Sequence, residues 1–228
     1  MLQTFTQPSA RPMPPSIWST LTTANTRAQA AGVPSTAGVE ISVKRGAMIF
    51  DEGDDALYLY KLVSGSVRLA RVMEEGYRQI CDFILPGNLL GFASDDQHEF
   101  SAQAIEDCVL IRYRRSAMGA LIGENGDFAR DLQEMTANGL FGAYEHMLRL
   151  RQRSAKDRIL WFLLAMSRRA RTPDVLHLPM SRCDIADYLG MAHETVSRVF
   201  TQLKKAGVIT EAAVNHIKIL KPAALRHA

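Results

Sequence analysis

The chain has 228 residues, 47% of them hydrophobic, and carries 27 Lys and Arg against 24 Asp and Glu. This length allows a sizeable core in one or two domains. No apolar run reaches the roughly 18 residues that predict a membrane span, and the start lacks the basic and apolar segments of a secretory signal peptide. We therefore expect a cytoplasmic protein with no membrane partner.

Charge is distributed unevenly along the chain. Residues 39–148 contain 10 Lys and Arg against 18 Asp and Glu, whereas residues 149–228 contain 15 against 6. A basic C-terminal third beside an acidic middle is typical of a protein in which one module meets nucleic-acid phosphates and the other does not.

Cysteine and histidine are sparse. The three cysteines, Cys81, Cys108 and Cys183, are too scattered for a disulfide framework or a four-cysteine cluster. The six histidines share no close ligand spacing. We accordingly predict no metal site and no cofactor.

The first half of the chain contains two kinds of segment. Residues 1–38 hold five prolines among Thr, Ser, Ala and Gln, which predicts an N-terminal arm or a disordered tail. Residues 39–126 contain short β-like runs separated by glycines, the clearest at 57–63, 66–72 and 108–113, which predicts an antiparallel barrel or jelly roll. The sequence Glu74-Glu75-Gly76-Tyr77 predicts a hairpin turn before a strand at 79–83.

A long helix is expected over residues 127–152, because helical spacing of apolar residues continues there without a proline. Its apolar residues form two lines. One can pack against the barrel and the other against a partner helix, so we predict a parallel helix pair in a homodimer; alternatively, both lines are buried within one chain. The residues expected at the dimer seam are Leu132, Met135, Leu140, Ala143, Met147 and Leu150.

Residues 153–228 contain the most informative pattern. Ser181 and Asp184 form a capping box that starts a helix over 182–189, Gly190 ends it, and a second helix follows over 193–205. With a preceding helix at 155–169 and β-like runs at 208–209 and 217–219, this pattern predicts a winged helix-turn-helix domain. In such a domain the N-terminal end of the second helix enters the major groove.

The outward face of this second helix carries side chains that can read bases. Arg198 can donate twice to guanine, Glu194 can accept from the cytosine amino group, and Ser197 can contact thymine. Two alternatives stay open. Glu194 can instead be a first-turn acid that interacts favourably with the helix dipole, and Arg198 can instead bind a phosphate. His193 contacts a base, a phosphate or only solvent.

Three stretches together resemble the CRP/FNR superfamily of bacterial transcription regulators, over about residues 39–222. They are FILPGNLLGF at 83–92, SAKDRILWFLLAMSRR at 154–169, and the helix-turn-helix. The resemblance implies an α+β fold with an N-terminal antiparallel β-roll like a cyclic-nucleotide-binding jelly roll, a long dimerisation helix, and the winged helix-turn-helix domain.

The run from Glu194 to Arg198 is similar to the E-x-x-S-R motif of the FNR and FixK branches; the cyclic AMP branch has Gly in place of Ser197. The resemblance implies double-stranded DNA with a TTGA-N6-TCAA inverted repeat as the partner, and His193 departs from the aliphatic or Arg residue of many relatives. In this fold helix ends and flanking cations meet the DNA backbone, which implies that role for Arg182, Thr195, Lys204, Lys205, Lys156 and Arg153.

The resemblance also defines what the usual sensors would require. The Gly-Glu and Arg-Ser pairs that hold cyclic AMP correspond to the segment from Gly91-Phe92 to Phe100-Ser101, where the acid and the arginine are both absent. Residues 1–80 contain no cysteine for an iron–sulfur cluster. The pattern that remains is that of FixK proteins, which implies an activator of microaerobic and nitrogen-fixation genes that uses neither cyclic nucleotide nor cluster.

Two further features suggest regulation. Cys183 lies in the first turn of the helix-turn-helix, where the helix dipole and Arg182 favour a thiolate and Asp184 opposes it, so its oxidation beside DNA phosphates would inhibit binding; alternatively, Cys183 is an inert small residue. Family activators touch RNA polymerase through barrel loops, and the residues in such a position here are Glu74, Glu75, Tyr77 and Gln79.

Two other functions are compatible with part of the sequence. One is a regulator gated by a non-nucleotide small molecule in the β-roll. The other is a cupin-like jelly-roll metalloenzyme, which needs several histidines and a carboxylate inside the barrel. Only His98 lies in the barrel region, so we predict that the protein is not an enzyme.

Overall fold

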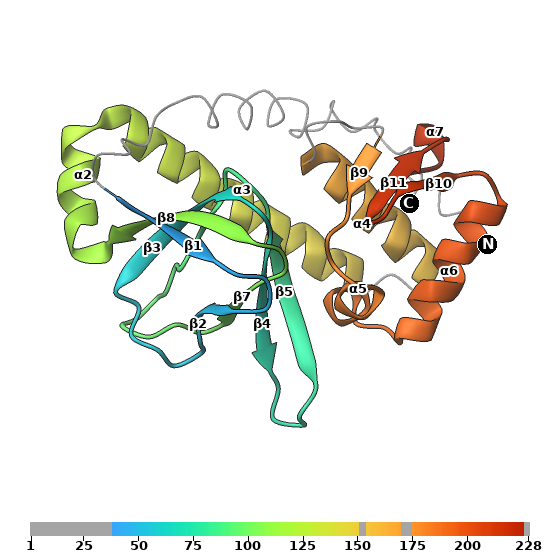
Figure 1. Ribbon diagram of the computed structural model, residues 1–228, viewed down its shortest axis with the longest axis horizontal. Coiled ribbons are helices and arrows are strands. Elements are labelled where there is room, and N and C mark those ends of the chain that lie inside the picture. The colour runs from blue at the N-terminus through green and yellow to red at the C-terminus, as the bar shows by residue number, and fades with distance from the viewer. Residues whose placement is uncertain (1–37, 151–153, 170–174, 226–228) are drawn as a thin grey trace, which may run out of the picture.

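The computed structural model describes residues 38–150, 154–169 and 175–225, and shows a β-roll, a long helix and a C-terminal domain (Figure 1). The α+β class predicted from the sequence is confirmed. The predicted N-terminal arm, except for residue 38, and Arg153 lie outside the described residues.

The β-roll consists of two antiparallel four-stranded sheets, ordered β1-β8-β3-β6 and β2-β7-β4-β5. The four predicted strands are confirmed as β3, β4, β5 and β8, and each end lies within one residue of the predicted one. The bounds are β1 Val39–Val43, β2 Met48–Phe50, β3 Tyr58–Ser64, β4 Val67–Val72, β5 Arg78–Ile84, β6 Leu89–Leu90, β7 Ser101–Ala104 and β8 Cys108–Arg114.

The space between the two sheets is filled by side chains that alternate along the strands, including the fully buried Leu62, Val67 and Leu110. The β4–β5 hairpin projects well beyond this core (Figure 1). Its turn is the predicted one: the Met73 amide donates to the Tyr77 carbonyl at 2.9 Å, and Gly76 adopts φ +85°, which glycine tolerates best.

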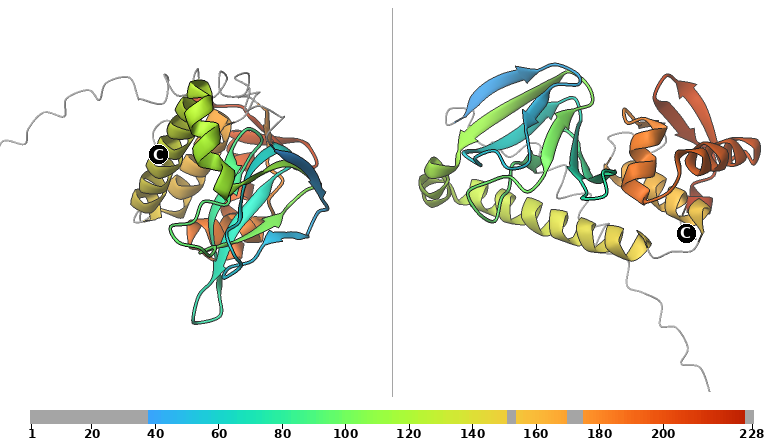
Figure 2. Two further views of the ribbon diagram at one scale, coloured as in Figure 1. Left: turned by 90° about the vertical axis from the view of Figure 1, so that its left-hand side faces the viewer. Right: turned by 90° about the horizontal axis from the view of Figure 1, so that it is seen from below.

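Helices follow the β-roll. A short 3₁₀ turn, η2 (Arg115–Ala117), leads into α2 (Met118–Glu124) and then into α3 (Gly126–Leu150), which runs along the β-roll as far as the C-terminal domain (Figure 2). Phe128 anchors the start of α3 against the buried Tyr113 ring, with centroids 6.4 Å apart. The long helix predicted over 127–152 is therefore present, one residue earlier at its start.

The C-terminal domain is a winged helix-turn-helix. Its elements are α4 (Ala155–Arg169), β9 (Val175–His177), α5 (Arg182–Leu189), α6 (His193–Lys205), β10 (Ile209–Ala213), β11 (His216–Ile219) and α7 (Pro222–Leu225). The three predicted helices have the bounds expected from the sequence. The wing is a three-stranded sheet, β10-β11-β9, of which the sequence had predicted two strands. No helix in the described ranges has the length and apolar character that a membrane crossing requires.

The C-terminal domain docks directly on the β-roll. Ile80 and Phe83 of β5 belong to the same buried cluster as Phe162 of α4 and Tyr188 of α5. The rings of Phe83 and Tyr188 are 5.2 Å apart. His146 of α3 also packs in this interface between the domains. Its ring stacks on Tyr188 at 3.9 Å between ring centres, and its Nε2 donates to the Tyr188 carbonyl at 2.8 Å.

The buried His146 at this interface predicts that the stability of the protein depends on pH. Burial lowers the pKa of His146 by more than the Tyr188 carbonyl and the charge of Asp82 raise it. The folded protein therefore prefers the neutral imidazole, so the stabilisation is complete above the ordinary histidine pKa of about 6.5 and is lost as pH falls below it. We expect the unfolding temperature to fall between pH 7.5 and pH 5.5 more steeply for the parent than for His146→Gln. Equal slopes for the two proteins would contradict this assignment.

Candidate nucleic-acid interface

The helix-turn-helix begins with a complete capping box. The Ser181 hydroxyl accepts from the Asp184 amide at 3.0 Å, and the Ser181 amide donates back to the Asp184 carboxylate at 3.0 Å. Gly190 ends α5 in the left-handed conformation, φ +59°. These two local signals fix the length of α5 and therefore the turn that leads into α6.

The recognition helix α6 has one buried and one open face. Val196, Val199, Phe200 and Leu203 are buried, as their spacing predicts. On the opposite face, near the N-terminal end, His193, Glu194, Ser197 and Arg198 are all exposed. The structure thus brings the four predicted reading residues together on one surface, which is the end of the helix that faces base edges in this class of domain.

Within this surface, His193 and Glu194 contact each other. The His193 Nδ1 lies 3.2 Å from a Glu194 carboxylate oxygen, and the Glu194 side chain is 74% exposed. The histidine that departs from the family pattern therefore touches the residue expected to read cytosine. This contact could not be predicted from the spacing, because neighbouring residues on a helix usually point in different directions.

The residues expected to meet the DNA backbone differ in their surroundings. Lys156 and Lys205 are exposed, and Thr195 is half-buried. Lys204 forms an ion pair with Glu211 of the wing. The guanidinium carbon of Arg182 lies 3.5 Å from the centre of the Phe200 ring, and burial lowers the pKa of Arg182. Arg182 therefore also braces α5 against α6.

Exposed apolar side chains cover one face of α3. Leu140, Phe141, Tyr144, Met147 and Leu148 are each at least half exposed. Of the predicted seam residues, Ala143 and Leu150 are also exposed, and Leu132 is half-buried. Met135 is also half-buried and, with Gly139 and Gly142, borders a cavity beside the β-roll. Leu140 and Ala143, two of the other predicted seam residues, border the same cavity.

That cavity has a volume of about 490 Å³ and lies between the β-roll, α3 and α4. Phe92 and Phe100, which occupy the segment used for cyclic nucleotides in the family, are both in its wall. His98 is buried and stacks on Phe50 at 3.7 Å between ring centres. In the described part of the chain, no three His, Cys, Asp or Glu side chains converge as metal ligands.

The three cysteines differ in burial. Cys183 is exposed, Cys81 is half-buried and Cys108 is buried. Burial raises the pKa of both Cys81 and Cys108, which disfavours their reactive thiolates. The exposure that the redox hypothesis requires of Cys183 is therefore present.

The predicted polymerase-contact turn needs one correction. Glu74, Glu75 and Tyr77 are exposed at the tip of the hairpin. Gln79, however, is half-buried, and its amide donates to the Asp187 carbonyl of α5 at 2.7 Å. Its side chain faces inward and contacts α5, so Gln79 is not one of the exposed residues that could touch RNA polymerase.

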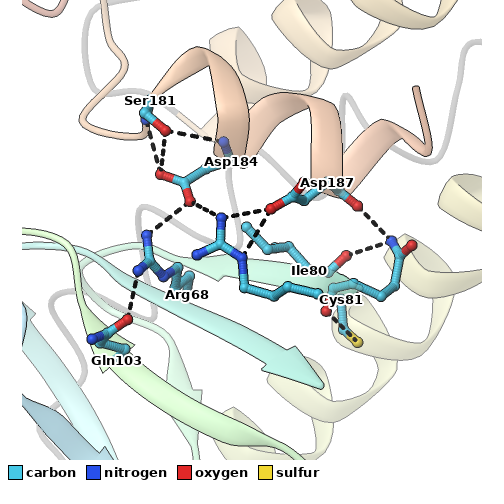
Figure 3. A network of polar contacts seen from close by, with 9 residues as sticks. Arg68, Ile80, Cys81, Gln103, Ser181, Asp184 and Asp187 are labelled. Carbon is cyan, nitrogen blue, oxygen red and sulfur yellow. Dashed lines mark hydrogen bonds and ion pairs between the residues drawn. The ribbon is translucent and has the colours of Figure 1, made fainter. Parts of the chain in front are cut away.

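A cluster of ion pairs between the domains could not be predicted from the sequence. Arg68 of β4 and Arg78 of β5 bind Asp184 and Asp187 of α5 (Figure 3). We call these four residues the α5 clamp. The sequence predicts Asp184 as a helix cap, and no local signal identifies its arginine partners, because they lie more than 100 residues away in the sequence.

Comparison with known proteins agrees with both domains. Residues 40–125 match the family model of the cyclic nucleotide-binding domain, and residues 157–228 match that of the Crp-like helix-turn-helix domain. The chain is 36% identical to the nitrogen fixation regulation protein FixK of Azorhizobium caulinodans, over 96% of this chain and 92% of that protein. It is 38% identical to FixK of Rhizobium meliloti, over 80% of this chain and 83% of that protein.

A solved structure is similar over most of the chain. The structure of FixK2 from Bradyrhizobium japonicum superimposes with a TM-score of 0.77 at 37% identity, covering 83% of this chain and 96% of that one.

Proposed function

The chain belongs to the CRP/FNR family of transcription regulators, whose members are not enzymes, and we propose that it activates transcription from TTGA-N6-TCAA-like inverted repeats in the cytoplasm. The observation that carries this proposal is the open face of α6, where Glu194, Ser197 and Arg198 lie together on a basic domain. The FixK relatives, named as regulators of nitrogen fixation, support a role in the control of nitrogen fixation.

In this proposal the protein acts as a homodimer. The apolar face of α3 is open in the single chain, and pairing it with the same face of a second copy would remove it from water. Two recognition helices would then read two half-sites whose centres are ten base pairs apart, about one helical turn.

No effector is required in this proposal. Phe92 and Phe100 offer neither charge nor hydrogen bonds to a cyclic phosphate. The test is fluorescence anisotropy with purified, effector-free protein and a TTGA-N6-TCAA duplex. We expect a dissociation constant of about 10⁻⁸ M or lower, unchanged by cyclic AMP. Equal affinity for a duplex with scrambled half-sites would overturn the proposal.

A second candidate rests on the cavity beside the β-roll. Its volume of about 490 Å³ is within the usual range for small-molecule sites, and aromatic side chains contribute to its wall. In this alternative a non-nucleotide effector binds there and gates DNA binding. The same anisotropy measurement separates the two candidates, because a gated regulator would bind the repeat weakly without its effector.

The exposed Cys183 supports redox inhibition. Oxidation to a sulfinic acid would add negative charge at the first turn of α5, close to where DNA phosphates would lie. We expect peroxide to weaken DNA binding by the parent about tenfold, which is the order of loss expected when one phosphate contact is removed. DNA binding by Cys183→Ser should be unaffected. Cys81→Ser is the matched control and should behave like the parent. Equal sensitivity of Cys183→Ser and the parent would refute the mechanism.

The tip of the β4–β5 hairpin is the surface that we propose for RNA polymerase. Glu74, Glu75 and Tyr77 are exposed there, and the hairpin projects away from both the β-roll core and α6 (Figure 1). A partner bound at this tip would therefore leave the reading face of α6 free.

A further inference from the structure

The α5 clamp is a cluster of three ion pairs between the two domains. Arg68 Nη1 and Arg78 Nη2 lie 2.8 Å and 2.7 Å from the same oxygen of Asp184. Arg78 also donates from Nε to the Asp187 carboxylate at 2.9 Å. Figure 3 shows Asp184 and Asp187 side by side on α5, with the guanidinium groups reaching them from the β-roll.

The clamp is held on both sides. Asp184 is only 4% exposed, and its second oxygen is bound by the Ser181 hydroxyl at 2.8 Å, so both oxygens are in use. Burial alone would raise the pKa of Asp184, but Ser181 and the two guanidinium groups together hold it below its usual value. On the β-roll side, Arg68 also donates to the Gln103 side chain. The charged, docked form is therefore the stable one.

The clamp acts on the reading helix through α5. Ile185 and Leu189 of α5 share a buried cluster with Val199 of α6, and Arg182 stacks on Phe200. The orientation of α6 relative to α5 is thus fixed within the domain. The orientation of α5 relative to the β-roll is held by the clamp and by the contact between Phe83 and Tyr188. Arg169 of α4 adds a second polar link, since it pairs with Asp82 of β5 at 3.1 Å.

We propose that the α5 clamp sets the spacer length that the dimer accepts, with Arg78 and Asp187 as positioning residues for DNA recognition. This inference rests on the proposed function, in which two copies read an inverted repeat. If α3 joins the copies, the separation and rotation of the two α6 helices depend on how firmly each C-terminal domain is held to its own β-roll and α3. One added base pair moves a half-site by about 3.4 Å and rotates it by roughly a tenth of a turn.

The experiment uses two variants that each remove one charge from the clamp, Asp187→Asn and Arg78→Gln. Both positions are about one-third exposed, so these changes weaken the clamp without opening a core. The matched control is Arg71→Gln. Arg71 lies on the same hairpin, but its ion pair with Glu52, at 2.8 Å, joins two residues of the β-roll and does not reach the C-terminal domain. Anisotropy is measured on duplexes with N5, N6 and N7 spacers and on a duplex with one TTGA half-site.

We expect the parent and Arg71→Gln to prefer N6 over N5 and N7 by about tenfold or more, since a shifted half-site loses its base contacts. In the two clamp variants this preference should fall to about threefold or less, with half-site affinity unchanged. The double variant should lose little more than Arg78→Gln alone, because Arg78→Gln already removes the contact with Asp187 that Asp187→Asn weakens.

Each other outcome has a definite meaning. If the parent prefers N6 and the clamp variants keep that preference, the clamp does not set spacing and this inference is overturned while the proposed function stands. An equal loss of affinity on all duplexes, the half-site included, would instead assign the clamp to folding and also overturn it. A parent without any spacer preference would overturn the proposed function as well.

Discussion

Glutamate in place of Leu140 and Met147 on α3 is expected to convert the proposed dimer to a monomer and to weaken binding to the proposed full repeat by about a hundredfold or more. Both side chains are more than half exposed in the single chain, at 51% and 58%, and lie on the apolar face of α3. Burying a carboxylate in an apolar helix pair is strongly unfavourable. A monomer reads one half-site and loses the gain from joining two binding events, which is typically 10²–10⁴-fold.

Light scattering after size exclusion gives the mass, and anisotropy gives the affinity. Val72→Glu is a suitable control, since Val72 is 66% exposed on β4 and lies away from the apolar face of α3. A dimeric mass for the double glutamate variant would show that α3 is not the seam. It would leave the alternative that the apolar face of α3 contacts another molecule.

Alanine in place of Arg198 is expected to weaken binding to the repeat by roughly thirtyfold or more. One bidentate contact to guanine discriminates by about 1–3 kcal/mol, and a dimer makes two of them, which gives about 2–6 kcal/mol. Arg198 is exposed on α6, so its removal should not affect folding. The measurement is anisotropy on the repeat and on duplexes that replace the guanine of each half-site.

The variant Arg198→Lys separates reading from charge. Lysine keeps the positive charge but lacks the planar two-donor geometry of arginine. We expect it to retain non-specific binding and to lose much of the discrimination against the replaced guanine. If Arg198→Ala lowers affinity equally on all duplexes, Arg198 binds a phosphate and does not read a base.

The parts of the fold that local chemistry determines could be predicted from the sequence. The capping box at Ser181 and the left-handed Gly190 set the bounds of α5, and the spacing of Val196, Val199 and Phe200 sets the buried face of α6. The strand β9 was missed because it has three residues and pairs only with β11, far along the chain. Such a short strand carries too little periodicity to be identified.

The relation between the domains could not be predicted. Arg68 and Arg78 are ordinary alternating strand residues in the sequence, and Asp187 is an ordinary polar position on a helix. Their contacts depend on the way β5 and α5 pack against each other, which no local pattern encodes. For the same reason Gln79 was assigned to an external surface, although its amide binds the Asp187 carbonyl.

Selection of bound sites from random DNA tests the central claim most directly, because it presupposes neither a sequence nor a spacing. Purified, effector-free protein is bound to a random duplex library, and the retained sites are sequenced. The account predicts enrichment of TTGA-like half-sites in inverted orientation, with centres about one helical turn apart. Enrichment of sites that lack this inverted repeat would contradict it.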